Sequence, residues 1–214
     1  LEFHPTKTRL AHTLLPEGGK AGFDFLGFEI RQYPVSRYNA KHGFKTLIKP
    51  SRTAIKRHYA QLCAIIKTNQ AASQDHLVRQ LNPVLVGWSK YYSAVISKAS
   101  FQRLDHLLYL RLARWARDRD AQKGRRWITR KYWRLGEGLG WRFGTKTGPL
   151  LTWHSTTPII RHSKVQGTAS PFNGDWRHWA ARRGYYPVIS RRVALLLKLQ
   201  HGRCGYCVLV FLPE

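Results

Sequence analysis

Residues 76–92 have the sequence HLVRQLNPVLVGWSKYY, in which apolar residues recur every three or four positions. This period places them on one face of an α-helix and predicts a buried helical surface. The face comprises Leu77, Leu81, Leu85, Trp88, Tyr92 and Val95. Proline lacks the N–H that a helix interior needs, so we expect the helix to kink or restart at Asn82-Pro83.

Similar helices are predicted on both sides of this stretch. Pro50 and Ser51 open the first, whose apolar face is Ile55, Tyr59, Leu62 and Ile66. Ser100 is expected to cap the third. The apolar face of that helix is Phe101, Leu104, Leu108, Leu112 and Trp115. Three amphipathic helices with short connections predict a small bundle.

The segments around the bundle are of mixed character. Residues 23–30 (FDFLGFEI) predict an aromatic strand in which Gly27 permits a bulge, and residues 44–48 predict the strand that returns beside it. Later elements are expected to be a helix at 125–133, short strands and loops over 135–175, and helices at 175–183 and 190–200. The predicted fold class is α+β and mainly helical, with a β-hairpin, a three-helix bundle and a basic, loop-rich segment.

The charge balance points to a polyanionic partner. The 214 residues include 37 Lys and Arg against 11 Asp and Glu, a formal net charge of +26. Such a chain repels itself unless phosphates screen it, and basic surfaces bind phosphates by releasing counterions. No stretch approaches the roughly 20 apolar residues of a membrane span, so we expect nucleic acid and no membrane. A generally basic protein without this role is the alternative.

Basic residues cluster in three runs that hold few acids, residues 31–74, 111–134 and 142–192. Ordinary solvated surfaces mix the two signs, so these runs predict phosphate contacts. Tyr91 and Tyr92 cannot point in the same direction on a helix, which makes Tyr91 the better candidate for stacking on an unpaired base. The candidate contacts in and beside the bundle are Lys49, Arg52, Lys56, Arg57, Lys90, Tyr91, Arg111, Arg114, Arg125, Arg126, Arg130 and Lys131.

Cys204 and Cys207 form a C-x₂-C turn, which is half of a tetrahedral zinc site. The other half requires two more ligands. His201 is one candidate, and it is equally well explained as a residue at the end of a helix. Three cysteines in all favour a reducing compartment over a disulfide framework. Paired carboxylates, a P-loop, HExxH and GxSxG are absent from the sequence, so no catalytic centre is predicted.

Several segments resemble group II intron reverse transcriptases, which are also maturases, and they occur in the order found in that family. LEFHPTKT (1–8) resembles the segment after the catalytic loop, and GFDFLGF (22–28) resembles the block that closes the palm. KPS (49–51) resembles the opening of the thumb, or maturase domain X. LNP (81–83) with GWSKYY (87–92) resembles the signature of that domain, and KYW (131–133) resembles its end.

The later segments extend the resemblance. IRHSKV (160–165) and SPFNGDW (170–176) are similar to the DNA-binding region, and QHGRCGYC (200–207) is similar to the entrance of an HNH endonuclease domain. The domains implied are the end of the palm with its hairpin (1–49), the thumb or domain X (50–134), the DNA-binding region (135–192) and the start of a truncated zinc-bound HNH domain (193–214). The implied DNA contacts are Arg161, His162, Lys164, Arg177, Arg182 and Arg183.

The resemblance implies a parent enzyme, an RNA-directed DNA polymerase that helps its intron splice and nicks target DNA. Its partners would be group II intron RNA, the template-primer duplex and target DNA, in a bacterial cytoplasm or an organelle. We expect the polymerase aspartates with their Mg²⁺ before Leu1, and the HNH histidines with the second cysteine pair after Glu214. Because the chain has no Met, we expect it to be an excerpt, catalytically inert by itself, with Cys204 and Cys207 as a zinc half-site.

Three alternatives remain. The chain could belong to a structural RNA-binding protein, although the block at residues 22–28 disfavours it. It could be a zinc HNH nuclease with a basic amino-terminal extension. It could also come from a reverse transcriptase of another lineage, which the DNA-binding and cysteine segments disfavour.

Overall fold

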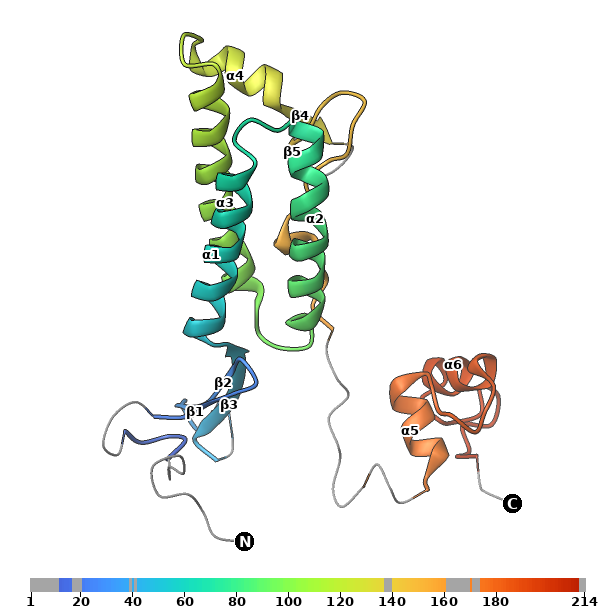
Figure 1. Ribbon diagram of the computed structural model, residues 1–214. Helices are drawn as coiled ribbons and strands as arrows, with labels where there is room; N and C mark the ends of the chain where they lie inside the picture. Colours follow the sequence, from blue (N-terminus) through green and yellow to red (C-terminus); the bar gives the residue numbers. More distant parts are fainter. Residues whose placement is uncertain are drawn as a thin grey trace, which may run out of the picture. The chain divides into compact units, whose positions relative to one another are not determined.

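The computed structural model describes residues 12–16, 21–38, 40, 42–136, 140–160, 170 and 174–211 (Figure 1). The chain divides into two compact units, unit 1 up to Ile160 and unit 2 from Arg161 onward. Helices and two small sheets confirm the predicted α+β class. Unit 1 contains β1 (Phe23–Phe25), β2 (Phe28–Pro34), β3 (Phe44–Pro50), α1 (Arg52–Thr68), α2 (Gln74–Tyr91), α3 (Lys98–Arg119), α4 (Arg125–Tyr132), β4 (Trp133–Gly136), β5 (Gly140–Phe143) and the 3₁₀ turn η1 (His154–Thr156).

The first sheet has the order β1-β2-β3, and all its pairs are antiparallel. The predicted pairing of two strands is present between β2 and β3, but residues 23–30 are not one strand with a bulge. Leu26 and Gly27 have φ angles of 48° and 82°, and this left-handed pair turns the chain back so that Phe25 pairs with Phe28. A Cβ on Gly27 would lie 2.6 Å from the Tyr92 hydroxyl, so glycine is required for both φ and space.

The bundle helices follow the predicted periodicity with three differences. On α1 the buried line is Ala54, His58, Leu62 and Ile66, so the face is rotated from the predicted one. Helix α2 runs through Pro83 without a break, because Leu81 and Leu85 on either side are buried in the same core and hold it together. Helix α3 begins at Lys98, before the predicted cap at Ser100. Its N-cap residue is Ser97, whose hydroxyl donates to the Tyr92 carbonyl and does not cap the helix.

One hydrophobic core joins the bundle to the segment that follows it. Fully buried leucines of α1, α2 and α3 pack with Trp115, with Tyr132 at the end of α4, and with Phe143 and Leu151 beyond it. The compact unit therefore extends through Ile160, whereas the predicted thumb ended at Arg134. The boundary at residue 134 between the thumb and the DNA-binding region stays a prediction.

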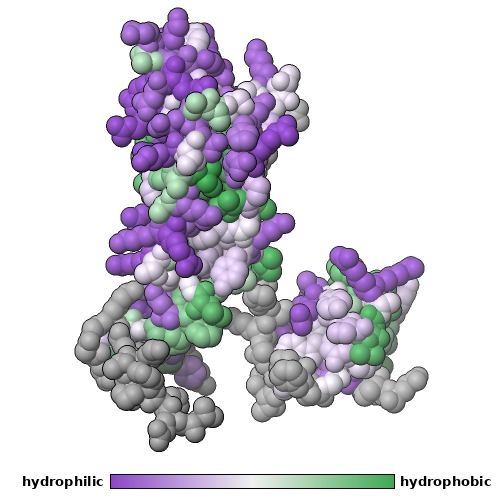
Figure 2. Space-filling view, viewed as in Figure 1, coloured by the Kyte–Doolittle hydropathy of each residue, from purple (hydrophilic) through white to green (hydrophobic). Residues whose placement is uncertain are grey.

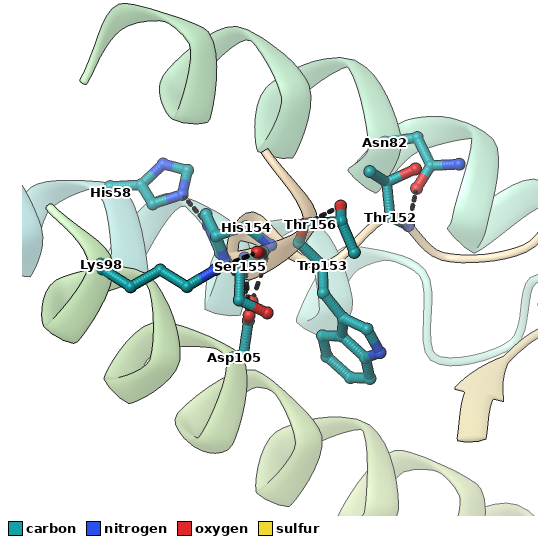
Figure 3. Close-up of polar contacts among 9 residues, drawn as sticks. All are labelled: His58, Asn82, Lys98, Asp105, Thr152, Trp153, His154, Ser155 and Thr156. Atoms are coloured by element: carbon teal, nitrogen blue, oxygen red, sulfur yellow. Dashed lines mark hydrogen bonds and ion pairs between the residues drawn. The ribbon is translucent and has the colours of Figure 1, made fainter. Parts of the chain in front are cut away.

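Residues 145–160, here called the strap, are held against α2 by side chains that act as backbone partners. The Asn82 amide donates to the Leu150 carbonyl at 2.9 Å. It also accepts from the Thr152 N–H at 2.9 Å (Figure 3). At the start of α2, Asp75 accepts from the Thr145 hydroxyl at 2.7 Å. At the other end, the Ile160 N–H donates to the Ser93 carbonyl. The strap thus has polar anchors along its whole length.

The strap also inserts a histidine between α1 and α3. His154 is fully buried, and its Nδ1 lies 2.6 Å from a carboxylate oxygen of Asp105 on α3. Its Nε2 lies 2.8 Å from Nε2 of His58 on α1 (Figure 3). The His58 ring stacks on Trp88 of α2 at 4.5 Å between centroids. This buried chain connects all three helices.

Burial determines the protonation of the hydrogen-bonded chain His58–His154–Asp105. Burial, together with the neighbouring His154, lowers the pKa of His58 to about 3, so His58 is neutral near neutral pH. Burial alone would raise the pKa of Asp105, but hydrogen bonds from His154 and Ser155 lower it below its ordinary value. Asp105 is therefore an ionised acceptor, which fixes Nδ1 of His154 as the donor.

Unit 2 is built on α5 (Trp176–Arg183) and α6 (Arg191–Leu199), close to the predicted positions. Asp175 caps α5 by accepting from the His178 N–H, and Gly184 ends it with a φ of 69°. Ser190 caps α6. Ala180, Ala194 and Leu197 form one small buried cluster in this unit, with Trp176, Ala181, Tyr186 and Ile189 packed around them. Trp179 is buried as well.

Candidate nucleic-acid interface

The basic residues of α1 lie away from the core. Arg52, Lys56 and Arg57 are all exposed, whereas the positions on the opposite line of the helix are buried. Capping by Ser51, whose hydroxyl accepts from the Ala54 N–H, starts the helix directly before Arg52 and so fixes where these side chains emerge. The helical pattern predicted this placement correctly.

The acids of the bundle do not neutralise this surface. Residues 50–136 contain four acids, Asp75, Asp105, Asp118 and Asp120. Asp75 and Asp105 bind the strap, and Asp120 accepts hydrogen bonds from Lys131 and Tyr132 at 2.8 and 2.7 Å. Only Asp118 of the four is exposed on the surface. The positive charge of the bundle therefore faces solvent nearly uncompensated.

Three of the predicted contacts have partners within the protein, and a fourth is partly covered. Nζ of Lys49 lies 4.4 Å above the ring of Tyr33, and Lys131 pairs with Asp120. The Tyr91 hydroxyl donates to the Leu26 carbonyl at 3.0 Å, and its ring stacks on Phe28. Arg111 is half-buried. These side chains hold the sheet or the helices in place, which leaves them less free to engage a partner.

The other eight predicted contacts in unit 1 are exposed, and within the described part of the chain none forms a side-chain hydrogen bond or ion pair. They are Arg52, Lys56, Arg57, Lys90, Arg114, Arg125, Arg126 and Arg130. Hydrophilic side chains cover the part of unit 1 over α3 and α4 (Figure 2). Arg103 and Arg117, which the sequence reasoning missed, are also exposed on α3. Phe101, Leu104 and Leu108 mark the buried face of α3, and the positions of both arginines off this face would have predicted their exposure.

The predicted DNA contacts divide into two groups. Arg161, His162 and Lys164 lie outside the described residues. Arg177, Arg182 and Arg183 are on α5, and the first two line a pocket of about 430 Å³. His178, His201 and Arg203 contribute to the same pocket. Arg177 also donates to the Phe211 carbonyl. Unit 2 therefore contains a pocket whose polar walls are mostly basic.

Cys204 and Cys207 lie on one tight turn. The Cys204 N–H donates to the Leu209 carbonyl and its carbonyl accepts from the Val208 N–H. Backbone N–H groups of Cys207 and Tyr206 point to the Cys204 sulfur and lower the pKa of its thiol. Such a turn suits a thiolate ligand, yet among the described residues no group of three or more His, Cys, Asp or Glu could hold a metal. The zinc half-site at these two thiols stays a prediction.

Among the helices that the structure describes, none is long and apolar enough to cross a membrane.

Comparison with known proteins bears on the bundle. A comparison with curated proteins found no match. The model of one protein family, described as the group II intron, maturase-specific domain, matches residues 55–133. This range begins in the first turn of α1 and ends at the first residue of β4, so it covers nearly all of the bundle and its exposed basic residues apart from Arg52. The helical bundle of this chain is therefore similar to a group II intron maturase-specific domain.

Proposed function

We propose that unit 1 binds structured group II intron RNA and that this binding assists splicing. The observation that carries the proposal is the exposed basic face of a maturase-specific domain whose acids are nearly all engaged internally. Exposed arginines and lysines on the surfaces of rigid helices contact phosphates and position the protein on its RNA. The buried His58–His154–Asp105 chain keeps α1, α2 and α3 in a fixed arrangement, so the charges present one surface.

The parent protein, in this proposal, is a group II intron reverse transcriptase. Its polymerase and HNH endonuclease activities, with Mg²⁺ and a complete zinc site, would reside in parts of the protein other than the described residues. Cys204 and Cys207 would supply two thiolates to that zinc. The template-primer duplex would share the surface of unit 1.

Target DNA, needed for retrohoming, is proposed to bind unit 2. The basic pocket on α5, with Arg177, Arg182 and Arg203 in its walls, favours an anionic partner. Three arginines and two histidines, with Asp175 as an acid beside them, suit a phosphate group, because guanidinium groups bind phosphate with paired hydrogen bonds.

The test of the RNA proposal compares two charge-removing triples in the full chain. Arg52→Gln, Lys56→Gln and Arg57→Gln together should weaken binding to a group II intron RNA by on the order of tenfold or more. The control triple, Arg191→Gln, Arg192→Gln and Lys198→Gln, removes the same charge from α6 of unit 2, where these residues are exposed. It should weaken binding much less. Equal losses from the two triples would show general charge attraction and contradict the assigned face.

A further inference from the structure

A pocket of about 330 Å³ lies between the carboxy-terminal half of α3 and α4. Tyr109, Ile128 and Trp133 contribute apolar walls. Arg117, Lys123 and Arg125 also line it, and no acid does. A volume at the lower end of the range for ligand pockets suits one small aromatic group.

The walls are rigid and aromatic. Tyr109 meets Trp133 edge to face with 5.7 Å between ring centroids, and Trp133 packs in the same manner on Phe143 of the core. Tyr109 is 38% exposed, whereas Trp133 is 5% exposed. One ring therefore faces the opening, and the other is set in the core.

A buried donor at this pocket has no protein partner. The indole N–H of Trp133 is buried, and no acceptor for it is present among the described residues. Buried polar groups are nearly always hydrogen-bonded, and a ligand in the pocket could pair with this N–H once a small shift of the neighbouring side chains uncovers it. A nucleobase has ring nitrogens and carbonyl oxygens at its edge that accept such a bond.

We propose that this α3–α4 pocket takes the base of a single unpaired RNA nucleotide, with its phosphates on Arg117, Lys123 and Arg125. The inference rests on the proposed RNA binding and deepens it, since it assigns a preference for bulged or looped RNA. Stacking on Tyr109 provides the attraction for any base, and the basic rim selects a polyanion over an apolar peptide.

The test uses two RNA hairpins that differ by one bulged nucleotide, with the full chain. The chain should bind the bulged hairpin about tenfold more tightly, which is the order of one base–aromatic stack. Tyr109→Leu removes the ring, and Ala121→Trp fills the mouth of the pocket from an exposed turn position. Both variants should bind the two hairpins equally while keeping the affinity for the paired one.

Ala71→Trp is the matched control, because it places the same ring on another exposed turn. It should retain the preference for the bulge. Equal binding of both hairpins by the unmodified chain would overturn the proposal that the pocket binds a base, and the proposed RNA binding of unit 1 would be unaffected. Binding of neither would overturn both. A preference for the bulged hairpin that survives Ala121→Trp would show that the base does not enter the pocket and would also overturn the inference. The apolar walls would then suit a side chain of a partner protein.

Discussion

Unit 1 and unit 2 use apolar residues in opposite ways. In unit 1, leucines of three helices are fully buried in one core together with residues of the strap. In unit 2, α6 has the sequence RRVALLLKL, yet Ala194 and Leu197 are its buried positions. Val193, Leu195, Leu196 and Leu199 of the same helix are exposed. Apolar side chains of α6 are therefore exposed beside Arg191, Arg192 and Lys198, whereas an amphipathic helix of a complete domain buries its apolar face.

This difference separates a domain that completes its own core from one that does not. Buried apolar area is the main source of folding free energy, at roughly 25 cal/mol per Å². We therefore expect unit 1 to dominate the stability of the chain and unit 2 to unfold more readily. The rigid surface required for RNA binding would then belong to the stable unit.

The largest expected effect is a cavity in the core of unit 1. Leu62 is fully buried, so Leu62→Ala should lower the free energy of unfolding by about 2–5 kcal/mol. Leu197→Ala, the matched change in unit 2, should leave the main transition unchanged. Urea unfolding followed by circular dichroism measures both. An equal loss from the two variants would contradict the separation of the units.

The next effect is a loss of stability in acid. His58 has a pKa of about 3 in the folded chain and about 6.5 when unfolded. Between these values His58 binds a proton in the unfolded state and stays neutral in the folded state. Stability should fall by up to about 1 kcal/mol per pH unit between pH 6.5 and 3. Asp105, whose pKa is lowered, adds a further loss as the pH drops below its ordinary value.

The variant that tests this is His58→Gln, which cannot titrate. Its urea midpoint should change less between pH 7 and pH 5 than that of the unmodified chain. His76→Gln is the control, because His76 is exposed on the same bundle and its removal should leave the pH dependence as it is. A pH dependence that survives His58→Gln would mean that another group controls it.

A smaller effect is expected at the strap. Asn82→Ala leaves the Leu150 carbonyl and the Thr152 N–H without their partner, which should cost about 1–3 kcal/mol. Proteolysis should then cut within residues 145–160 before the helices. Gln80→Ala, at an exposed position of the same helix, is the control. Unchanged resistance of the strap would show that its apolar anchors suffice.

The smallest effect concerns the cysteines. Cys204→Ser with Cys207→Ser should leave the main unfolding transition within about 0.5 kcal/mol, because both residues lie in unit 2 and are not buried. Zinc should bind the chain weakly and be removed by a chelator, since two thiolates make half a ligand set. Tightly held, stoichiometric zinc would show that His201 or another nearby group completes the site.

Local patterns were enough to predict the helices, because apolar spacing directly reports which face is buried. Local patterns failed where tertiary contacts determine the backbone conformation. Pro83 did not divide α2 into two helices, since residues on both sides of it are buried in the same core, and Leu26 adopted a left-handed conformation that its side chain disfavours. The cap at Ser100 was wrong because Ser97 turns the chain three residues earlier.

The candidate site was predicted in part for a related reason. Exposed basic positions follow from helix geometry, so Arg52, Lys56 and Arg57 were placed correctly. The internal partners of Lys131 and Tyr91 lie 11 and 65 residues earlier in the sequence, at Asp120 and Leu26, and could not be seen in a local pattern. His58 and His154 are 96 residues apart, and His154 and Asp105 are 49 apart. The polar chain that fixes the bundle was invisible for this reason.

The most direct test of the central claim is the salt dependence of RNA affinity. If the basic face of unit 1 contacts six or more phosphates, raising salt from about 50 to 200 mM should weaken binding of a structured RNA on the order of a thousandfold. The triple variant of Arg52, Lys56 and Arg57 should show a shallower slope of log affinity against log salt, by roughly one for each contact removed. A flat response in the unmodified chain, or an identical slope in the variant, would contradict phosphate binding by this face.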